Sequence, residues 1–86
     1  MMLKQSELNR IKGNFLYKGI PYTGVTINNS NRIFYFKDGG LHNEEGPAVL
    51  PENTYWLEYE EYSFNTWCKK LNKTEEDIII LKLKYE

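Results

Sequence analysis

One histidine and two nearby acids form the most chemically suggestive cluster in this chain. His42 is the only histidine, and Glu44 and Glu45 follow it closely. An imidazole beside carboxylates is the pattern of an acid–base pair or of metal ligands. A zinc site needs three or four converging ligands, and a lone histidine beside adjacent acids does not supply them. We therefore interpret His42 as a turn residue that hydrogen-bonds to one of the two glutamates, and we expect no metal, no cofactor and no catalytic residue.

The single cysteine, Cys68, is the other side chain with reactive chemistry. It shares one helical stripe with Phe64, Trp67 and Leu71. A thiol on such a stripe is typical of a small buried core residue, and one cysteine cannot form an internal disulfide. The chain also has no glycine-rich phosphate-binding loop, so we expect a protein that is not an enzyme.

The segments that position these residues divide into a β-rich part and a helical tail. Turn residues recur about every ten residues between 15 and 62, and they separate short runs of β-branched and aromatic residues. Residues 32–37 form the clearest strand, and Asp38-Gly39 after it predicts a tight hairpin turn. The spacing indicates an antiparallel β-meander over 15–62. Residues 1–14 are weakly patterned and predict an N-terminal arm or a short helix.

The tail, residues 63–86, carries two helix-start signals. Ser63 precedes the apolar stripe as an N-cap, and Thr74 begins a second segment in which Asp77 completes a capping box. Acids then occupy the first turn of this second segment and lysines lie toward its end, which suits the helix dipole. The caps favour a helix over 75–83, although alternate apolar residues there also fit a strand.

Length and composition are those of one small globular domain, 1–86. The chain is 41% hydrophobic and 27% charged, with a net charge of −1. Near-neutral charge argues against a nucleic-acid partner held by electrostatics, and the apolar run at 78–81 is too short to span a bilayer. With no signal-peptide pattern, we expect no membrane association and a cytoplasmic location. The predicted fold class is α+β: a small antiparallel β-meander of four to five strands with one or two C-terminal helices packed on it.

The aromatic content exceeds what a core of this size hides. Seven tyrosines and two tryptophans are present, and these residue types are favoured at protein interfaces. Acids concentrate around the last strand. The predicted partner-binding residues are Tyr35, Tyr55, Glu58, Tyr59, Glu60 and Glu61. A nucleotide-binding alternative, in which tyrosines stack on bases and an arginine holds phosphate, uses Tyr22, Arg32 and Tyr35.

One segment resembles a repeat of small bacteriophage proteins. Residues 39–49, GGLHNEEGPAV, followed by Tyr55-Trp56, are similar to the MORN-like hairpin repeat G-x-L-H-R-x-D-G-P-A. Asn43 stands where that repeat has arginine, and Glu45 where it has aspartate. The helical tail resembles the ending of the same proteins, and residues 19–24 form a degenerate second copy. The resemblance implies a phage origin and a hairpin-based fold, and it implies no enzyme activity.

These observations lead to three hypotheses on function. The first is a small phage-encoded, non-enzymatic interaction protein that binds and inhibits a host protein in the host cytoplasm, as an anti-defence inhibitor acting by steric occlusion. The second is a homo-oligomeric sponge that sequesters a nucleotide signalling molecule. The third is a structural or antitoxin-like accessory module.

Overall fold

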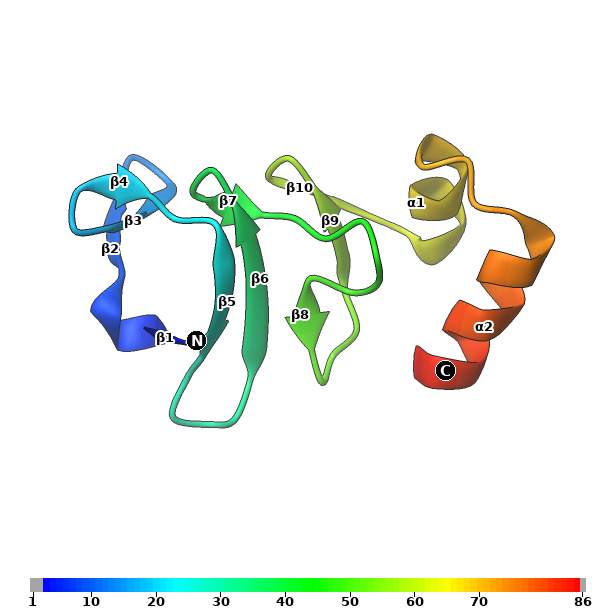
Figure 1. Cartoon of the computed structure of the whole chain (residues 1–86), viewed down its shortest axis with the longest axis horizontal. Helices are drawn as coiled ribbons and strands as arrows, with labels where there is room; N and C mark the ends of the chain where they lie inside the picture. The colour runs from blue at the N-terminus through cyan, green and yellow to red at the C-terminus, as the bar shows by residue number, and fades with distance from the viewer. Residues whose placement is uncertain (1–2, 86) are drawn as a thin grey trace.

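The computed structural model describes residues 3–85 as an elongated row of β-hairpins that ends in two helices (Figure 1). Its principal extents are 40 × 23 × 19 Å. Met1, Met2 and Glu86, which belong to the predicted segments 1–14 and 63–86, lie outside the described residues. The predicted α+β class is confirmed. No described helix is long and apolar enough to cross a membrane.

Within the described residues, three small sheets follow one another along the long axis (Figure 1). The first contains β2 (Asn9–Ile11), β3 (Asn14–Tyr17) and β4 (Ile20–Pro21). The second contains β1 (Leu3–Lys4), β5 (Gly24–Ile27), β6 (Ile33–Lys37), β7 (Gly40–Leu41) and β8 (Val49–Leu50). The third contains β9 (Tyr55–Leu57) and β10 (Glu60–Tyr62). The strands pair antiparallel as predicted, except that β1 runs parallel to β5. They do not form one continuous meander. Because each strand is only two to five residues long, the chain passes from one small sheet to the next after a few strands.

The N-terminal segment differs from the predicted arm or short helix. Leu3–Lys4 pair with β5, a 3₁₀ turn covers Gln5–Glu7, and β2 pairs with β3. Leu3 is buried, and the side-chain oxygen of Gln5 accepts a hydrogen bond from the Thr26 hydroxyl. The open edge of β5 and the burial of Leu3 therefore outweigh the weak helical pattern.

Four tight turns within residues 3–85 shape the hairpins, and three of them recur every twenty residues. In each turn both central residues have positive φ, which is the signature of a type I′ turn. The pairs are Lys12-Gly13, Lys18-Gly19, Asp38-Gly39 and Glu58-Tyr59. Gly19, Gly39 and Tyr59 occupy equivalent positions twenty residues apart, so the pairs β3–β4, β6–β7 and β9–β10 repeat one hairpin pattern. We call these pairs the first, second and third hairpin. Of the four turns, only the last has a side chain at its second position, where Tyr59 has φ 77°.

The turns at Asp38-Gly39 and Glu58-Tyr59 each dock on the preceding hairpin through backbone hydrogen bonds. The Gly39 N–H donates to the Tyr22 carbonyl at 2.9 Å, and the Phe15 N–H donates to the Gly39 carbonyl at 2.8 Å. One repeat later, the Tyr59 N–H donates to the Leu41 carbonyl at 3.3 Å. These bonds satisfy backbone groups of the turns and hold the row of hairpins together.

An aromatic cluster fills the space between the first two hairpins. Phe36 lies at its centre, with its ring centroid 5.0 Å from that of Phe15 and 6.1 Å from that of Tyr22. Phe34 stacks beside it on the same face of β6 at 6.4 Å. Rings at these separations bury apolar surface and add favourable edge and offset contacts.

Two helices cap the row of hairpins at the third sheet. They are α1 (Phe64–Lys70) and α2 (Glu75–Tyr85), so the helix prediction for 75–83 is confirmed and the strand alternative is wrong. Ser63 accepts a hydrogen bond from the Thr66 N–H, as an N-cap does. The predicted capping box is also confirmed, because Thr74 and Asp77 each accept from the other's backbone N–H.

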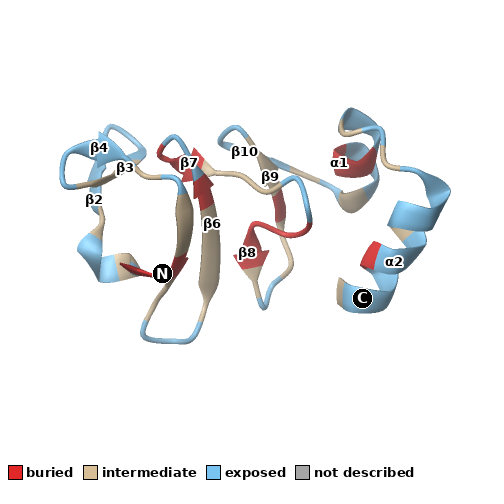
Figure 2. Ribbon diagram, in the orientation of Figure 1, coloured by how far each residue is buried: buried red, intermediate tan, exposed pale blue. Residues whose placement is uncertain are grey.

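The core beneath the helices surrounds Trp67, which is fully buried. Tyr55 of β9 packs on it with ring centroids 4.8 Å apart, and Cys68 and Leu81 complete the buried cluster (Figure 2). Cys68 is thus a buried core residue, as its stripe predicted. The helices cover the end of the row rather than a face of the largest sheet, because the aromatic stripe of α1 meets Tyr55.

Candidate functional site

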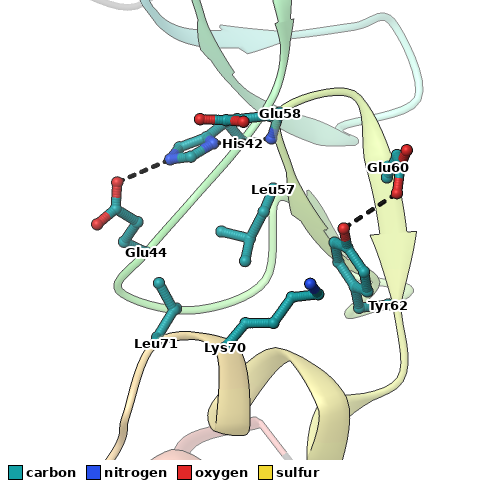
Figure 3. Close-up of a pocket in the computed structure, with 8 residues that line it drawn as sticks. All are labelled: His42, Glu44, Leu57, Glu58, Glu60, Tyr62, Lys70 and Leu71. Atoms are coloured by element: carbon teal, nitrogen blue, oxygen red, sulfur yellow. Dashed lines mark hydrogen bonds and ion pairs between the residues drawn. The ribbon is translucent and has the colours of Figure 1, made fainter.

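An open groove of about 330 Å³ lies between the turn of the third hairpin and α1 (Figure 3). Its sides come from the loop after β7, from β9 and β10, and from α1. The lining residues are His42, Glu44, Leu57, Glu58, Glu60, Tyr62, Lys70 and Leu71. Three carboxylates and one ammonium group line it, so the groove carries net negative charge.

His42 holds the groove together with both ring nitrogens. Nδ1 accepts a hydrogen bond from the Glu58 N–H at 3.0 Å, so the proton lies on Nε2, which donates to the Glu44 carboxylate at 2.8 Å. The predicted bond from His42 to a glutamate is therefore confirmed for Glu44. The side chain of His42 is only 9% exposed, and this arrangement gives it a structural role that joins the loop to the hairpin turn. The hydrogen bond from His42 lowers the pKa of Glu44, which keeps this carboxylate ionised.

The opposite wall of the groove is a second hydrogen-bonded group. The Tyr62 hydroxyl donates to the Glu60 carboxylate at 3.0 Å, and this bond raises the pKa of Tyr62 (Figure 3). The Lys70 ammonium lies 5.0 Å from the Tyr62 ring centroid, a cation–π distance. Leu57 and Leu71 supply an apolar floor between the two walls (Figure 3).

The predicted partner-binding residues fall into two groups. Glu58, Tyr59, Glu60 and Glu61 lie together at the exposed tip of the third hairpin. Tyr35 is half-buried on β6, in a different sheet from that tip, and Tyr55 is 6% exposed in the core beside Trp67. We therefore leave Tyr55 out of the candidate surface.

The predicted partner-binding residues include two of the eight that line the groove, Glu58 and Glu60. The other six were not predicted as binding residues: His42, Glu44, Leu57, Tyr62, Lys70 and Leu71. Tyr62 sits opposite Tyr55 in the β9–β10 register, whereas Lys70 is a full helix away. For Tyr62 and Lys70, the only sequence signals are a tyrosine at a strand end and a lysine beside an apolar helix stripe. Neither signal shows that the two side chains meet.

A second cavity, of about 340 Å³, combines aromatic rings with cations. The lining residues are Arg10, Lys12, Gly13, Asn14, Phe15, Gly40, Leu41, Trp56 and Tyr59. The Arg10 guanidinium lies 5.3 Å from the Phe15 centroid. The Tyr59 hydroxyl donates to the Asp38 carbonyl at 2.6 Å, and this bond fixes the ring. Rings and cations without a carboxylate in the lining suit an aromatic anion.

The residues of the nucleotide site predicted from the sequence each interact with a different neighbour. Arg32 pairs with Glu52 at 2.9 Å. The Tyr22 hydroxyl donates to the Val25 carbonyl at 3.0 Å. Tyr35 lies directly opposite Val25, on the other face of β6 from the aromatic cluster. The aromatic and cationic chemistry expected of that site is instead gathered in the second cavity.

Among residues 3–85, no three histidine, cysteine, aspartate or glutamate side chains are grouped so that they could hold a metal ion. The candidate sites are the groove beside His42, which we call the acidic groove, and the second cavity, which we call the aromatic cavity. Comparisons of the chain with protein-family models, with curated proteins and with solved structures gave no match.

Proposed function

We propose that the chain is a non-enzymatic binding protein that inhibits a partner protein by covering a basic surface of it. The acidic groove carries this proposal. Its carboxylates Glu44, Glu58 and Glu60 border an apolar floor, and Glu58 and Glu60 lie at an exposed hairpin tip. A lysine- or arginine-rich segment fits such a groove, because its charged heads meet carboxylates while its aliphatic stems pack on leucines.

The rigidity of the groove supports occlusion as the mechanism. His42 joins the loop and the hairpin turn by two hydrogen bonds, and the Tyr62–Glu60 bond holds the other wall. A surface that is ordered before binding loses little conformational entropy on binding. Such a surface can block a partner without any chemical step.

The resemblance of residues 39–49 to phage hairpin repeats supports a more specific proposal. In it, the protein is phage-encoded, acts in the host cytoplasm and inhibits a host defence factor. The target would then present a basic surface that it needs for its own activity, such as a nucleic-acid channel.

Affinity capture from host lysate tests the proposal, with bound proteins identified by mass spectrometry. We expect the wild-type chain to retain one protein at a stoichiometric level. The double variant Glu58→Lys and Glu60→Lys should lose this protein, because its groove would repel a basic segment. Raising the salt concentration should also weaken capture, since exposed charge pairs are screened.

Glu45→Lys is the matched control, because Glu45 is exposed and does not line the groove. We expect this variant to capture the same protein as the wild type. Equal loss of capture in the control and in the groove variant would contradict the assignment of the groove. Absence of any stoichiometric partner would contradict the proposal as a whole.

The aromatic cavity favours a second candidate function, the sequestration of a nucleotide. Phe15, Trp56 and Tyr59 offer rings to a base, and Arg10 and Lys12 offer charge to phosphate. Calorimetric titration with cyclic dinucleotides and with mononucleotides tests it. Binding that is lost in Arg10→Ala and kept in Arg32→Ala would support this cavity, and the absence of heat with every nucleotide would exclude the candidate.

A further inference from the structure

Helix α2 carries apolar residues on two opposite faces. One face packs into the core through Leu81 and its neighbours. The other face is turned to solvent and leaves Ile79 58%, Ile80 50% and Leu83 81% exposed. These three residues have the i, i+1, i+4 spacing of one continuous stripe, on the side of the helix away from Leu81. We call Ile79, Ile80 and Leu83 the outer stripe.

The position of α2 leaves the outer stripe accessible. The helix forms one end of the molecule, and its core face is turned toward the hairpins (Figures 1 and 2). Neither the acidic groove nor the aromatic cavity includes a residue of α2. Exposed apolar patches of this kind are typical of interaction sites.

Charges on α2 identify the partner that fits this stripe. The first turn holds Glu75, Glu76 and Asp77, and the last turn holds Lys82 and Lys84. A rotation of about 100° per residue places Glu75 and Lys82 on one flank of the outer stripe, and Asp77 and Lys84 on the other. Each flank therefore has an acid near one end and a lysine near the other, which is self-complementary when two such helices run antiparallel.

We propose that two copies of this chain associate through an antiparallel pair of α2 helices, around a twofold axis between Ile79 and Ile80. A twofold axis brings each flank against the same flank of the second copy. Glu75 then meets the partner's Lys82, and Asp77 meets the partner's Lys84. Ile79 packs against the partner's Ile80, and Leu83 packs beside the stem of the partner's Glu76.

The charge pattern favours an antiparallel second copy of α2 over other partners for the outer stripe. A parallel pair would place acids beside acids and lysines beside lysines, which is repulsive. An acidic or a basic partner helix would match only one half of each flank. The antiparallel second copy satisfies both halves and covers the outer stripe at once.

The length of α2 sets the strength of this association. Its eleven residues span about 16 Å, so the contact is smaller than the roughly 800 Å² per partner of a standard interface. The dimer should therefore be weak and depend on protein concentration. Sedimentation velocity across about 10 µM to about 1 mM covers the range in which such a dimer forms.

The first test removes the outer stripe. We expect the wild-type chain to shift from monomer to dimer across that range, and Leu83→Glu to stay monomeric throughout. Leu83 is largely exposed, so the far-UV circular dichroism of the variant should match that of the wild type. Ile79→Ser provides a second variant should Leu83→Glu change the spectrum, and its dimer should be weaker by about tenfold.

The second test checks the register with charge reversals. Glu75→Lys alone should weaken the dimer, because it sets a lysine against the partner's Lys82. Adding Lys82→Glu should restore dimerisation, since the pair is reversed on the same flank. Adding Lys84→Glu instead gives the same net charge but should not restore it, because that residue lies on the other flank and would meet the partner's Asp77.

Three results would overturn the inference: a wild-type monomer at about 1 mM, a dimer of unchanged strength in folded Leu83→Glu, or equal behaviour of the two double variants. None of these results depends on the proposed function, since the groove and the aromatic cavity lie outside α2.

Discussion

Tyr59 occupies a tight turn and also connects two hairpins through its side chain. It occupies a position that glycine takes in the other three turns, with φ 77°. Its ring covers Gly40 so closely that a Cβ there would lie 2.3 Å from the ring, and its hydroxyl bonds to the Asp38 carbonyl. The positive φ of Tyr59 costs about 1 kcal/mol of backbone strain. The contacts that join the second and third hairpins offset this cost.

This balance predicts different effects for two substitutions of Tyr59. Tyr59→Ala loses the ring and hydroxyl contacts and keeps the backbone strain, whereas Tyr59→Gly loses the same contacts and relieves the strain. We expect Tyr59→Gly to be more stable than Tyr59→Ala by about 1 kcal/mol in urea unfolding. Equal stabilities would show that the turn carries no strain at this residue.

Glu44 predicts a pH-dependent contribution to stability. Its pKa is lowered in the folded chain by the hydrogen bond from His42, so its stabilising effect is present above its ordinary pKa of 4.5 and is lost as the pH falls through the folded value. Glu44→Gln should therefore be less stable than the wild type near neutral pH, and the difference should shrink in acid.

Urea unfolding at about pH 7 and about pH 3 measures this difference. Glu45→Gln is the control, because the exposed Glu45 side chain lies outside the groove lining. A difference between Glu44→Gln and the wild type that persists unchanged in acid would contradict the role of the His42 bond.

At the scale of elements, local chemistry decides where the helices and hairpins begin. Type I′ turns impose a two-residue reversal at Asp38-Gly39, and the strands on either side pair at once. At α2, the hydroxyl of Thr74 and the carboxylate of Asp77 satisfy backbone N–H groups that a helix start leaves free. The boundary of α2 therefore depends on two side chains.

The capping box predicts the effect of removing Thr74. Thr74→Ala should destabilise the chain by about 1 kcal/mol, because one helix N–H loses its acceptor. Thr74→Ser should keep most of the stability, since it retains the hydroxyl. Thermal unfolding followed by circular dichroism measures both variants, and equal melting temperatures for them would contradict the cap.

At the scale of the whole molecule, the helical tail holds the last hairpin and the preceding loop together. The Trp67 indole N–H donates to the Asn43 carbonyl at 3.0 Å, and the Lys73 ammonium donates to the Glu44 carbonyl at 2.7 Å. The Trp67 ring also packs on Tyr55. Trp67 thus connects α1, β9 and the loop that follows β7.

This central position predicts that Trp67→Ala unfolds the chain. Loss of a fully buried tryptophan costs about 3–5 kcal/mol, which is a large part of the stability of a small domain. Trp56→Ala is the control, since Trp56 is only half-buried and should leave the chain folded. Native dispersion in the NMR spectrum of Trp67→Ala would contradict this account of the core.

The candidate site was predictable only in part. The choice of Glu58, Glu60 and Glu61 as surface residues followed from the concentration of acids around the last predicted strand, but the hairpin turn at Glu58-Tyr59 was not predicted. The groove itself was not predicted either, because it forms where that turn meets His42, sixteen residues earlier, and Lys70 of α1. Contacts between residues so far apart leave no local pattern.

The sequence by itself determined the elements that depend on neighbouring residues. The turn at Asp38-Gly39, the caps at Ser63 and Thr74 and the α+β class follow from backbone chemistry within a few residues. Only the tertiary structure decided that Tyr55 is buried, that the described strands divide into three sheets and that one stripe of α2 stays exposed. An aromatic or apolar residue has the same local pattern on a covered face and on an open one, so burial depends on which distant segment packs there.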